Sequence, residues 1–246
     1  MNYELEIIAF DIVSCSVAEA NGATRIELCA NPEEGGTTPS CGIIEQAKKA
    51  SGIPVFPIIR PRGGDFLYSK QEFEAIKSDI KQCLSIGCEG VVVGMLLPDG
   101  SIDTDRCKEL VEIAGPMDVT FHRAFDRVKD PIASLENIIS IGCKRILTSG
   151  LHKSALEGKS ILKSLVDKAD NRITIMLGSG VRSENVVQLA TETGALAFHS
   201  SARKSIGSSM YYKNPNMSEE LSHASLDGLE VQKIRENLDK YFNNQK

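Results

Sequence analysis

The sequence lacks a basic leader, a long apolar run and any block of lysine or arginine. No stretch approaches the roughly 18 apolar residues of a membrane-spanning helix, and residues 1–11, MNYELEIIAFD, show no basic region followed by a long apolar segment. The formal net charge of −5 at pH 7 makes nucleic acid and anionic membrane surfaces poor partners. We therefore expect a soluble protein that binds neither.

Two common metal motifs, CxxC and HExxH, are also absent, as is any paired methionine motif. The chain does hold seven cysteines, but their number is odd and they form no tight framework. Such cysteines are typical of reduced thiols in the cytosol. We therefore expect a cytoplasmic protein, and the spacing of its cysteines alone predicts no metal site.

Short β-rich runs alternate with helical patterns along nearly the whole chain. Three connections, residues 84–94, 139–150 and 191–200, repeat the same order of helix end, glycine turn and strand. Alternation of this kind is typical of a parallel sheet joined by crossover helices. The expected strands cover residues 5–10, 24–28, 55–60, 90–94, 119–123, 145–149, 173–177 and 195–200.

Eight such units in a chain of 246 residues match a (β/α)8 barrel, which typically needs about 250 residues. We therefore predict the α/β fold class, with a single TIM-type barrel domain over residues 1–246. An open doubly wound sheet is the alternative, but no GxGxxG follows the first expected strand.

The strand and helix pattern loosens after residue 202. Residues 203–226 are too long for an ordinary connector. We predict a long loop there, and its role as a lid, an oligomer contact or a mobile segment stays open. A terminal helix is predicted over residues 228–243, with an apolar face formed by Val231, Ile234, Leu238 and Tyr241.

The stretch VTFHRAFD, residues 119–126, ends an apolar strand in charged residues. Burial of an unpaired charge costs several kcal/mol, and the sites of TIM barrels lie at the carboxyl ends of the strands. Because side chains alternate along a strand, the strand ends should bring polar residues together at one mouth. The set expected there is Glu27, Cys29, Arg60, Arg62, His122, Arg123, Thr148, His199 and Ser201.

Two loops have the composition of anion-binding sites. IRPRGGD, residues 59–65, places two arginines beside a glycine pair. LGSGVRSEN, residues 177–185, follows the seventh expected strand; its Gly178 and Gly180 are positioned to bind phosphate through backbone N–H groups, with residues 200–203 as partner. A tight turn with a solvated arginine is the structural alternative for both loops.

The charged residues also have structural explanations, because a barrel interior is a packed core. Glu27 could form an interior ion pair with Arg25. Arg60 could pair with Glu27 or with Asp65. Cys29 could be a small buried apolar side chain, as free cysteines usually are.

An enzyme is one functional hypothesis. Arg60 and Arg62 would bind the anionic groups of a small, phosphorylated metabolite, and Glu27 or His122 would transfer protons. Isomerisation, aldol cleavage and lyase chemistry would all fit. Schiff-base chemistry is disfavoured because no lysine stands at an expected strand end.

A metal-binding protein is a second hypothesis. Cys29 is the one thiol expected at the mouth, and with Met176 and a nearby histidine it would give the soft ligand set that Cu(I) prefers. Cys88 and Cys143 follow helix-ending glycines at the opposite end of the barrel, where packing is the usual role. A scaffold for assembly with a vestigial site is a third hypothesis.

The segments RIELCANPEEGGTTPS, PVFPIIRPRGGDFLYS, VTFHRAFD, RILTSG and GSGVRSEN…HSSAR resemble the CutC family of copper homeostasis proteins. The resemblance covers residues 4–203. It implies a TIM-like barrel, a cytoplasmic location, a homodimer or larger homo-oligomer, and copper handling with Cu(I) bound by a cysteine. We therefore expect a copper homeostasis protein with Cys29 as the Cu(I) ligand, and the isomerase or lyase stays the alternative.

One position departs from the family pattern. Many relatives place a cysteine in the first strand, at the position of Ala9 here, and that cysteine is the natural partner of the one matching Cys29. A two-thiolate Cu(I) site built from the first two strands is therefore excluded unless Cys15 replaces the missing ligand. The charged strand ends, by contrast, match the family throughout.

Overall fold

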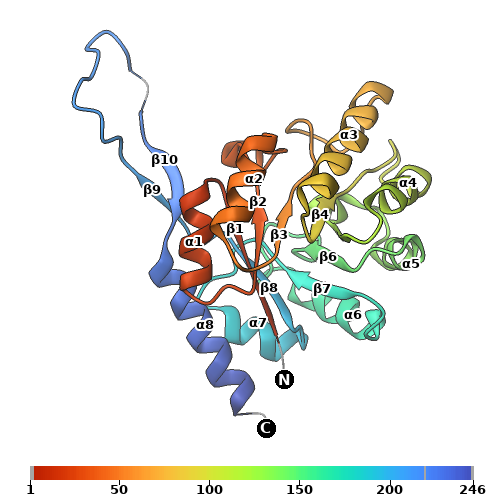
Figure 1. Cartoon of the computed structure of the whole chain (residues 1–246). Helices are drawn as coiled ribbons and strands as arrows, with labels where there is room; N and C mark the ends of the chain where they lie inside the picture. Colours follow the sequence, from red (N-terminus) through yellow and green to blue (C-terminus); the bar gives the residue numbers. More distant parts are fainter. Residues whose placement is uncertain (1–2, 219, 245–246) are drawn as a thin grey trace.

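The computed structural model describes residues 3–218 and 220–244. Eight parallel strands follow one another in the order β3-β2-β1-β8-β7-β6-β5-β4, and a parallel bridge between Ile58 and Val92 links the two end strands (Figure 1). The predicted fold class, a single-domain TIM-type barrel, is confirmed. The strands are β1 (Glu4–Ala9), β2 (Arg25–Leu28), β3 (Val55–Pro57), β4 (Gly90–Val93), β5 (Asp118–Phe121), β6 (Arg145–Thr148), β7 (Thr174–Leu177) and β8 (Ala197–Ser200).

Helices surround the strands (Figure 1). They are α1 (Ile12–Ala20), α2 (Cys41–Ala50), α3 (Lys70–Ile86), α4 (Thr104–Ala114), α5 (Pro131–Ile141), α6 (Lys159–Ala169), α7 (Val186–Thr193) and α8 (Gly228–Asn243), with short 3-10 helices at Pro32–Glu34 and Arg123–Arg127. The last helix, α8, packs against α1 and α7 and so completes the ring. Within the described ranges, no helix combines the length and the apolarity needed to cross a membrane.

Local sequence fixes the ends of these helices. Gly87, Gly142 and Gly194 end α3, α5 and α7 in the left-handed region, with φ of 83°, 97° and 73°, where glycine has no steric penalty. Helix α3 begins at a capping box in which the side chains of Ser69 and Glu72 each accept a hydrogen bond from the other's backbone N–H. The connection that repeats in the sequence is therefore one helix C-cap used three times.

The main apolar core lies between the strands and the helices. Leu5, Ile7 and Ala9 of β1 belong to it. The alternate residues Glu6 and Ile8 point to the inside of the barrel, as the twofold repeat of a strand requires. The barrel interior can therefore hold polar side chains without interrupting the main core.

The inside of the barrel contains a layer of paired charges. Arg25 lies 2.6 Å from a carboxylate oxygen of Glu6, and its guanidinium stacks 3.5 Å above the ring centroid of Phe56. Arg25 thus takes Glu6 as its partner, and not Glu27, the pairing considered from the sequence. The Glu27 carboxylate is left free for other contacts.

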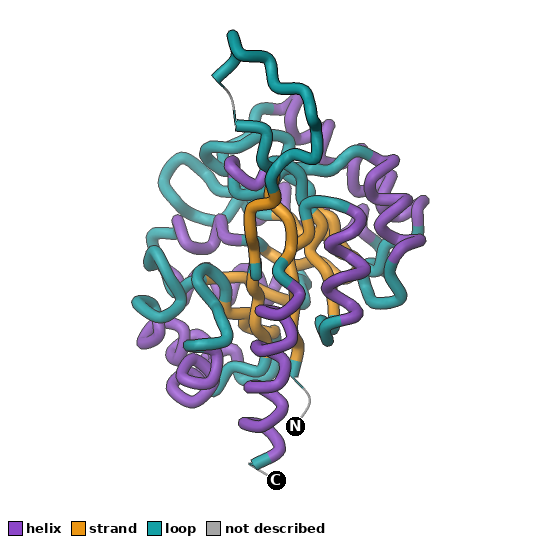
Figure 2. Tube along the Cα trace, turned by 90° about the vertical axis from the view of Figure 1, so that its left-hand side faces the viewer, coloured by secondary structure: helices purple, strands orange, loops and turns teal. Residues whose placement is uncertain are grey.

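The segment between β8 and α8 forms a projecting arm. Two short strands, β9 (Arg203–Ile206) and β10 (His223–Leu226), pair antiparallel at its base, so the segment expected as a loop begins and ends in a ribbon. The arm extends away from the barrel in both views (Figures 1 and 2). It is an insertion in the eighth βα unit, on the side of the barrel where the strands end.

Helix α8 packs through one apolar face. Val231, Ile234 and Leu238 are buried on it, as expected, but Phe242 and not Tyr241 is the fourth buried residue. Phe242 stacks on Tyr3 at a centroid distance of 5.2 Å. This contact with the N-terminal segment explains why the ring one position further along is the one that is covered.

Candidate functional site

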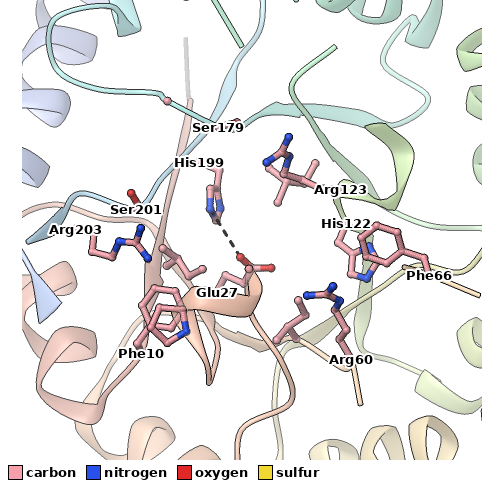
Figure 3. A pocket seen from close by; sticks show the side chains of 16 residues that line it. Phe10, Glu27, Arg60, Phe66, His122, Arg123, Ser179, His199, Ser201 and Arg203 are labelled. Carbon is pink, nitrogen blue, oxygen red and sulfur yellow. Dashed lines mark ion pairs between the residues drawn. The ribbon is translucent and has the colours of Figure 1, made fainter. Parts of the chain in front are cut away.

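A cavity of about 310 Å³ opens at the carboxyl ends of the strands (Figure 3). Its apolar walls come from the first barrel strands and the loops after them, including Phe10 and Phe66. Residues that the sequence places at the mouth supply most of its polar lining: Glu27, Arg60, His122, Arg123, Gly180, His199 and Ser201. The alternation of the strands therefore brings side chains from β2, β5 and β8 into one site.

Arg60 presents a buried positive charge to this cavity. Its guanidinium donates hydrogen bonds to the backbone carbonyls of Glu34 at 2.6 Å, Gly36 at 2.8 Å and Gly64 at 2.9 Å. These partners are dipoles and carry no net charge. The pairing with Glu27 or Asp65 considered from the sequence does not form; Asp65 pairs with Arg62 instead. A buried cation held in this way attracts an anion.

Arg62 lies outside the cavity, so the prediction that places it at the mouth is wrong. Its guanidinium lies 2.6 Å from Glu72 and 2.9 Å from Asp65, and 40% of its side chain is exposed. Pairing with the neighbouring strand continues past β3 to Ile59, whose N–H donates to Val92, and residues 61–64 form a bend, so the alternation does not extend to Arg62. Arg62 instead ties the start of α3 to the preceding loop.

His122 is a neutral hydrogen-bond donor. Its Nδ1 accepts a hydrogen bond from the backbone N–H of Ala124 at 3.2 Å, so the ring proton lies on Nε2. That Nε2 atom is buried and has no hydrogen-bond partner in the described part of the chain. Burial and the nearby charge of Arg60 lower the pKa of His122 to about 3. A neutral ring of this kind can donate a hydrogen bond from Nε2, and proton transfer by His122 stays a prediction.

Gly94 makes room for this ring. A Cβ atom at Gly94 would lie 2.4 Å from Nδ1 of His122 and 3.1 Å from the Cβ of Ala124. Such distances are far inside van der Waals contact, so any larger residue displaces the imidazole. The residue that follows β4 thus sets the position of the side chain that follows β5.

Glu27, His199 and Glu6 form a buried row of three ionisable groups, which we call the relay. The Nδ1 atom of His199 lies 2.7 Å from Glu6, and its Nε2 atom lies 3.8 Å from Glu27, the pair joined by a dashed line in Figure 3. One imidazole therefore lies between two carboxylates. Only Glu27 and His199 line the cavity, because Glu6 lies one layer deeper, against Arg25.

The three groups of this relay have separated pKa values. Burial raises the pKa of Glu27 to about 7, with the Glu6 charge adding to the rise and His199 opposing it. Burial also opposes ionisation of Glu6, but Arg25 and His199 together lower the pKa of Glu6 to about 2. Burial lowers the pKa of His199, yet its hydrogen bond to Glu6 and the charges of both glutamates produce a net rise. Glu27 is thus the carboxyl group that titrates near neutrality.

Arg123 and Thr148 are held by Asp126. The carboxylate of Asp126 lies 2.7 Å from Nε of Arg123 and accepts a hydrogen bond of 2.6 Å from the Thr148 hydroxyl. The backbone N–H of Ser149 donates to the same carboxylate at 2.9 Å. Arg123 lines the cavity with its charge balanced, whereas Thr148 supports the site from behind. These contacts explain how VTFHRAFD buries the charge of Asp126.

The loops after β7 and β8 close the side opposite Arg60 (Figure 3). Ser179 and Gly180 line the cavity with left-handed φ of 73° and 75°, and Ser201 and Arg203 follow from β8 and β9. Gly178, which the sequence placed in the anion loop, instead lies beneath the site: a Cβ there would meet Leu147 at 2.6 Å and His199 at 3.6 Å. The chain here approaches the cavity with its backbone.

Comparison with known proteins decides the family. The family model described as CutC matches residues 3–204. This chain belongs to the CutC family. It is 46% identical to the copper homeostasis protein cutC homolog of Mus musculus, over 94% of this chain and 86% of that protein. It is 44% identical to a family protein CutC of Chromobacterium violaceum, over 98% of this chain and 100% of that protein.

A solved structure of the family agrees with the fold. The structure described as a putative copper homeostasis protein CutC from Streptococcus agalactiae matches with a TM-score of 0.77 and 33% identity, over 80% of this chain and 97% of that one. The resemblance noted from the sequence motifs is therefore confirmed, and the barrel is the fold of a CutC protein.

The copper that the family name implies fits poorly at Cys29. The Cys29 thiol is 1% exposed and packs in an apolar cluster with Phe56, Ile58 and Val92. Burial and the adjacent Glu27 carboxylate raise the pKa of Cys29 well above its usual range, whereas Cu(I) binds the thiolate. The donor set around this thiol does not match a Cu(I) site.

The other soft donors considered for this CutC chain lie elsewhere. Met176 belongs to a separate interior cluster, and Cys15 lies with Ala9 in the core between strands and helices. The described residues do bring ligand atoms of Glu6, Glu27 and His199 within 4.8 Å of one another. That set holds carboxylates and an imidazole and does not include Cys29.

Several site residues were not found from the sequence. Glu6 had a signal, since it shares the inward side of β1 with Ile8. Arg203 was found only as the last residue of the segment 200–203, and the sequence did not predict the ribbon that holds it. Phe66 lies in a loop, and no sequence pattern gives its contact with the His122 ring at a centroid distance of 4.9 Å.

Proposed function

We propose that this CutC protein binds a small anionic, phosphorylated metabolite in the mouth of its barrel, and that Glu27 exchanges a proton with the bound ligand. The observation that carries the proposal is Arg60. Its guanidinium is buried at the cavity, and its hydrogen bonds go to three backbone carbonyls. A buried cation without a charge partner is costly in the free protein, and an anion removes that cost.

Glu27 supplies the acid–base group. Its carboxyl lies at the cavity, and its pKa of about 7 lets it give and accept protons near neutrality. His199 stands behind it and Glu6 fixes the orientation of the imidazole. This division of roles supports proton transfer of the isomerase or lyase type.

A thermal-shift experiment tests the proposal. 2-Phosphoglycolate should raise the melting temperature of the wild-type protein. Arg60→Ala should strongly reduce the rise, whereas Arg62→Ala, which removes an arginine outside the cavity, should leave it intact. Equal responses in the two variants would remove Arg60 from the binding site and contradict the proposal.

Cu(I) binding at Cys29 is the second candidate function. It follows from the names of relatives, which include copper homeostasis protein cutC homologs of Mus musculus and Homo sapiens. The geometry around Cys29 supports it less well than the cavity supports an anion. Cu(I) binding is therefore the alternative to anion binding, and the test that separates the two is given in the Discussion.

A cytoplasmic location and self-association belong to the same proposal. All seven cysteines are free thiols, which suits a reducing compartment.

The arm exposes Met210, Tyr211 and Tyr212, and apolar side chains of this kind are typical of interfaces. We propose a second copy of the chain as their partner, giving a homodimer or larger assembly. Light scattering should show a dimer for the wild type and a monomer after removal of residues 208–221; a dimer in both would exclude the arm as the contact.

A further inference from the structure

We propose that the ligand of this cavity carries two anionic groups, a phosphate held by Ser201, Arg203 and the Ser179–Gly180 turn, and a carboxylate held by His122 and Arg60. The inference rests on the proposed function and specifies its ligand. The atoms between the two groups then lie against Glu27.

The arrangement of the lining supports two separate ends. Figure 3 shows Arg60 and His122 on one side, Ser201 and Arg203 on the other, and Glu27 between them. The cavity of about 310 Å³ is at the lower limit of ordinary ligand pockets, which measure roughly 300–1,000 Å³. It has room for a compact metabolite with a charge at each end.

The His122 end has an unmet hydrogen-bonding capacity. Nε2 of His122 is buried without a partner among the described residues, and Nε of Arg60 is in the same state. Phe66 packs against both, with its ring centroid 4.9 Å from that of His122 and 5.0 Å from the Arg60 guanidinium carbon. Buried donors are normally satisfied, and both residues line the cavity, so these two unmet donors point to an acceptor in the ligand.

The chemistry of this end suits a carboxylate better than a phosphate. It offers one cation and one neutral N–H donor in a buried, partly aromatic setting. A phosphate dianion is costly to remove from water and needs more charge than this. A carboxylate carries one charge and is flat, so it matches a guanidinium beside an imidazole.

The opposite end suits a phosphate. Arg203 is exposed at its position on β9, so a dianion bound there keeps part of its hydration. The Ser179–Gly180 turn brings backbone to the cavity after β7, where barrels commonly bind phosphate. Ser201 adds a hydroxyl from the end of β8.

Calorimetric titration of the full chain with 2-phosphoglycolate, methyl phosphate and glycolate tests the inference. The two-ended ligand should bind at least about tenfold more tightly than either one-ended ligand, since one charge-assisted hydrogen bond contributes about that factor. This comparison needs only the wild-type protein. Similar affinity for methyl phosphate and 2-phosphoglycolate would overturn the second anion subsite while the proposed function stands. Absence of binding by all three would overturn both.

Substitutions test which residues form the phosphate end and which form the carboxylate end of the cavity. Arg203→Ser should weaken methyl phosphate and 2-phosphoglycolate about tenfold and leave glycolate unchanged. His122→Asn should weaken glycolate and 2-phosphoglycolate and leave methyl phosphate unchanged. The controls are Lys204→Ser, the next residue on β9, and His152→Asn, whose Nδ1 contacts Gly150. The opposite pattern of losses would contradict the assignment.

Discussion

The Nε2 atom of His199 lies 3.8 Å from a carboxylate oxygen of Glu27, and both side chains are buried. The other ring nitrogen of His199 lies 2.7 Å from Glu6. The pKa of Glu6 is about 2 and that of Glu27 is about 7. The imidazole of His199 therefore lies between one carboxylate that stays ionised and one carboxyl group that titrates near neutral pH. The proposed chemistry of the cavity depends on this asymmetry.

The pKa values of the two buried histidines should be shifted in opposite directions. The pKa of His199 is raised by its carboxylates, so its imidazole should stay protonated above pH 6.5; the pKa of His122 is lowered to about 3, so its ring should stay neutral far below pH 6.5. Nitrogen-15 NMR of histidine-labelled protein, titrated with acid and base, measures both. Two ordinary titrations near pH 6.5 would contradict this description of the relay.

Glu6→Gln should destabilise the fold in a pH-dependent way. Removing one partner of a buried ion pair leaves Arg25 uncompensated and costs about 3–5 kcal/mol. The folded-state pKa of Glu6 is lowered from 4.5 to about 2, so its stabilisation is complete above pH 4.5 and is lost as the pH falls through 2. Urea unfolding at pH 7 and at pH 2.5 should therefore show a smaller difference from wild type at the lower pH.

An exposed pair gives the control for this variant. Glu136 pairs with Arg172 on the surface at 2.7 Å, and Glu136→Gln should leave the free energy of unfolding nearly unchanged at either pH, because solvent screens an exposed pair. A loss equal to that of Glu6→Gln would show that burial does not distinguish the two pairs.

Gly94→Ala should displace His122 and weaken anion binding. The added Cβ would meet Nδ1 of His122 at 2.4 Å, and overpacking of this kind costs about 1–3 kcal/mol. Thermal unfolding with and without glycolate measures both effects. Gly42→Ala is the matched control, because nothing lies within 4 Å of its Cβ position in α2, and it should leave glycolate binding unchanged. Normal glycolate binding by Gly94→Ala would argue against His122 as a donor.

Cu(I) should find no single tight site at Cys29. The thiol is buried and its pKa is raised, so competition against a chromogenic chelator under anaerobic conditions should give weak uptake without defined stoichiometry. Cys29→Ser and Cys88→Ser should then behave alike. One tight equivalent lost only in Cys29→Ser would restore copper binding as the function of this site.

Strand alternation predicts a site residue only as far as the strand continues. It placed Glu27 correctly on the inner side, because β2 runs to Leu28. It misplaced Arg62, because strand pairing ends at Ile59 and residues 61–64 form a bend. The fold class could be predicted because it depends on local signals that repeat in the sequence, such as the glycine C-caps.

Protonation states could not be read from the sequence at all. Whether His122 is an acid or a neutral donor depends on its burial and on the charge of Arg60, which is distant in the chain. The protonation state of Glu27 likewise depends on the ion pair of Arg25, which forms with Glu6 and not with Glu27. Such contacts arise only when the barrel brings distant strands together.

A crystal structure of the protein with the anion that gives the largest thermal shift tests the central claim most directly. The account predicts the anion in the barrel mouth, with one oxygen accepting a hydrogen bond from Nε2 of His122 and another group contacting Arg60. An anion bound only at surface lysines, or a metal ion held by Glu27 and His199 in its place, would contradict the account.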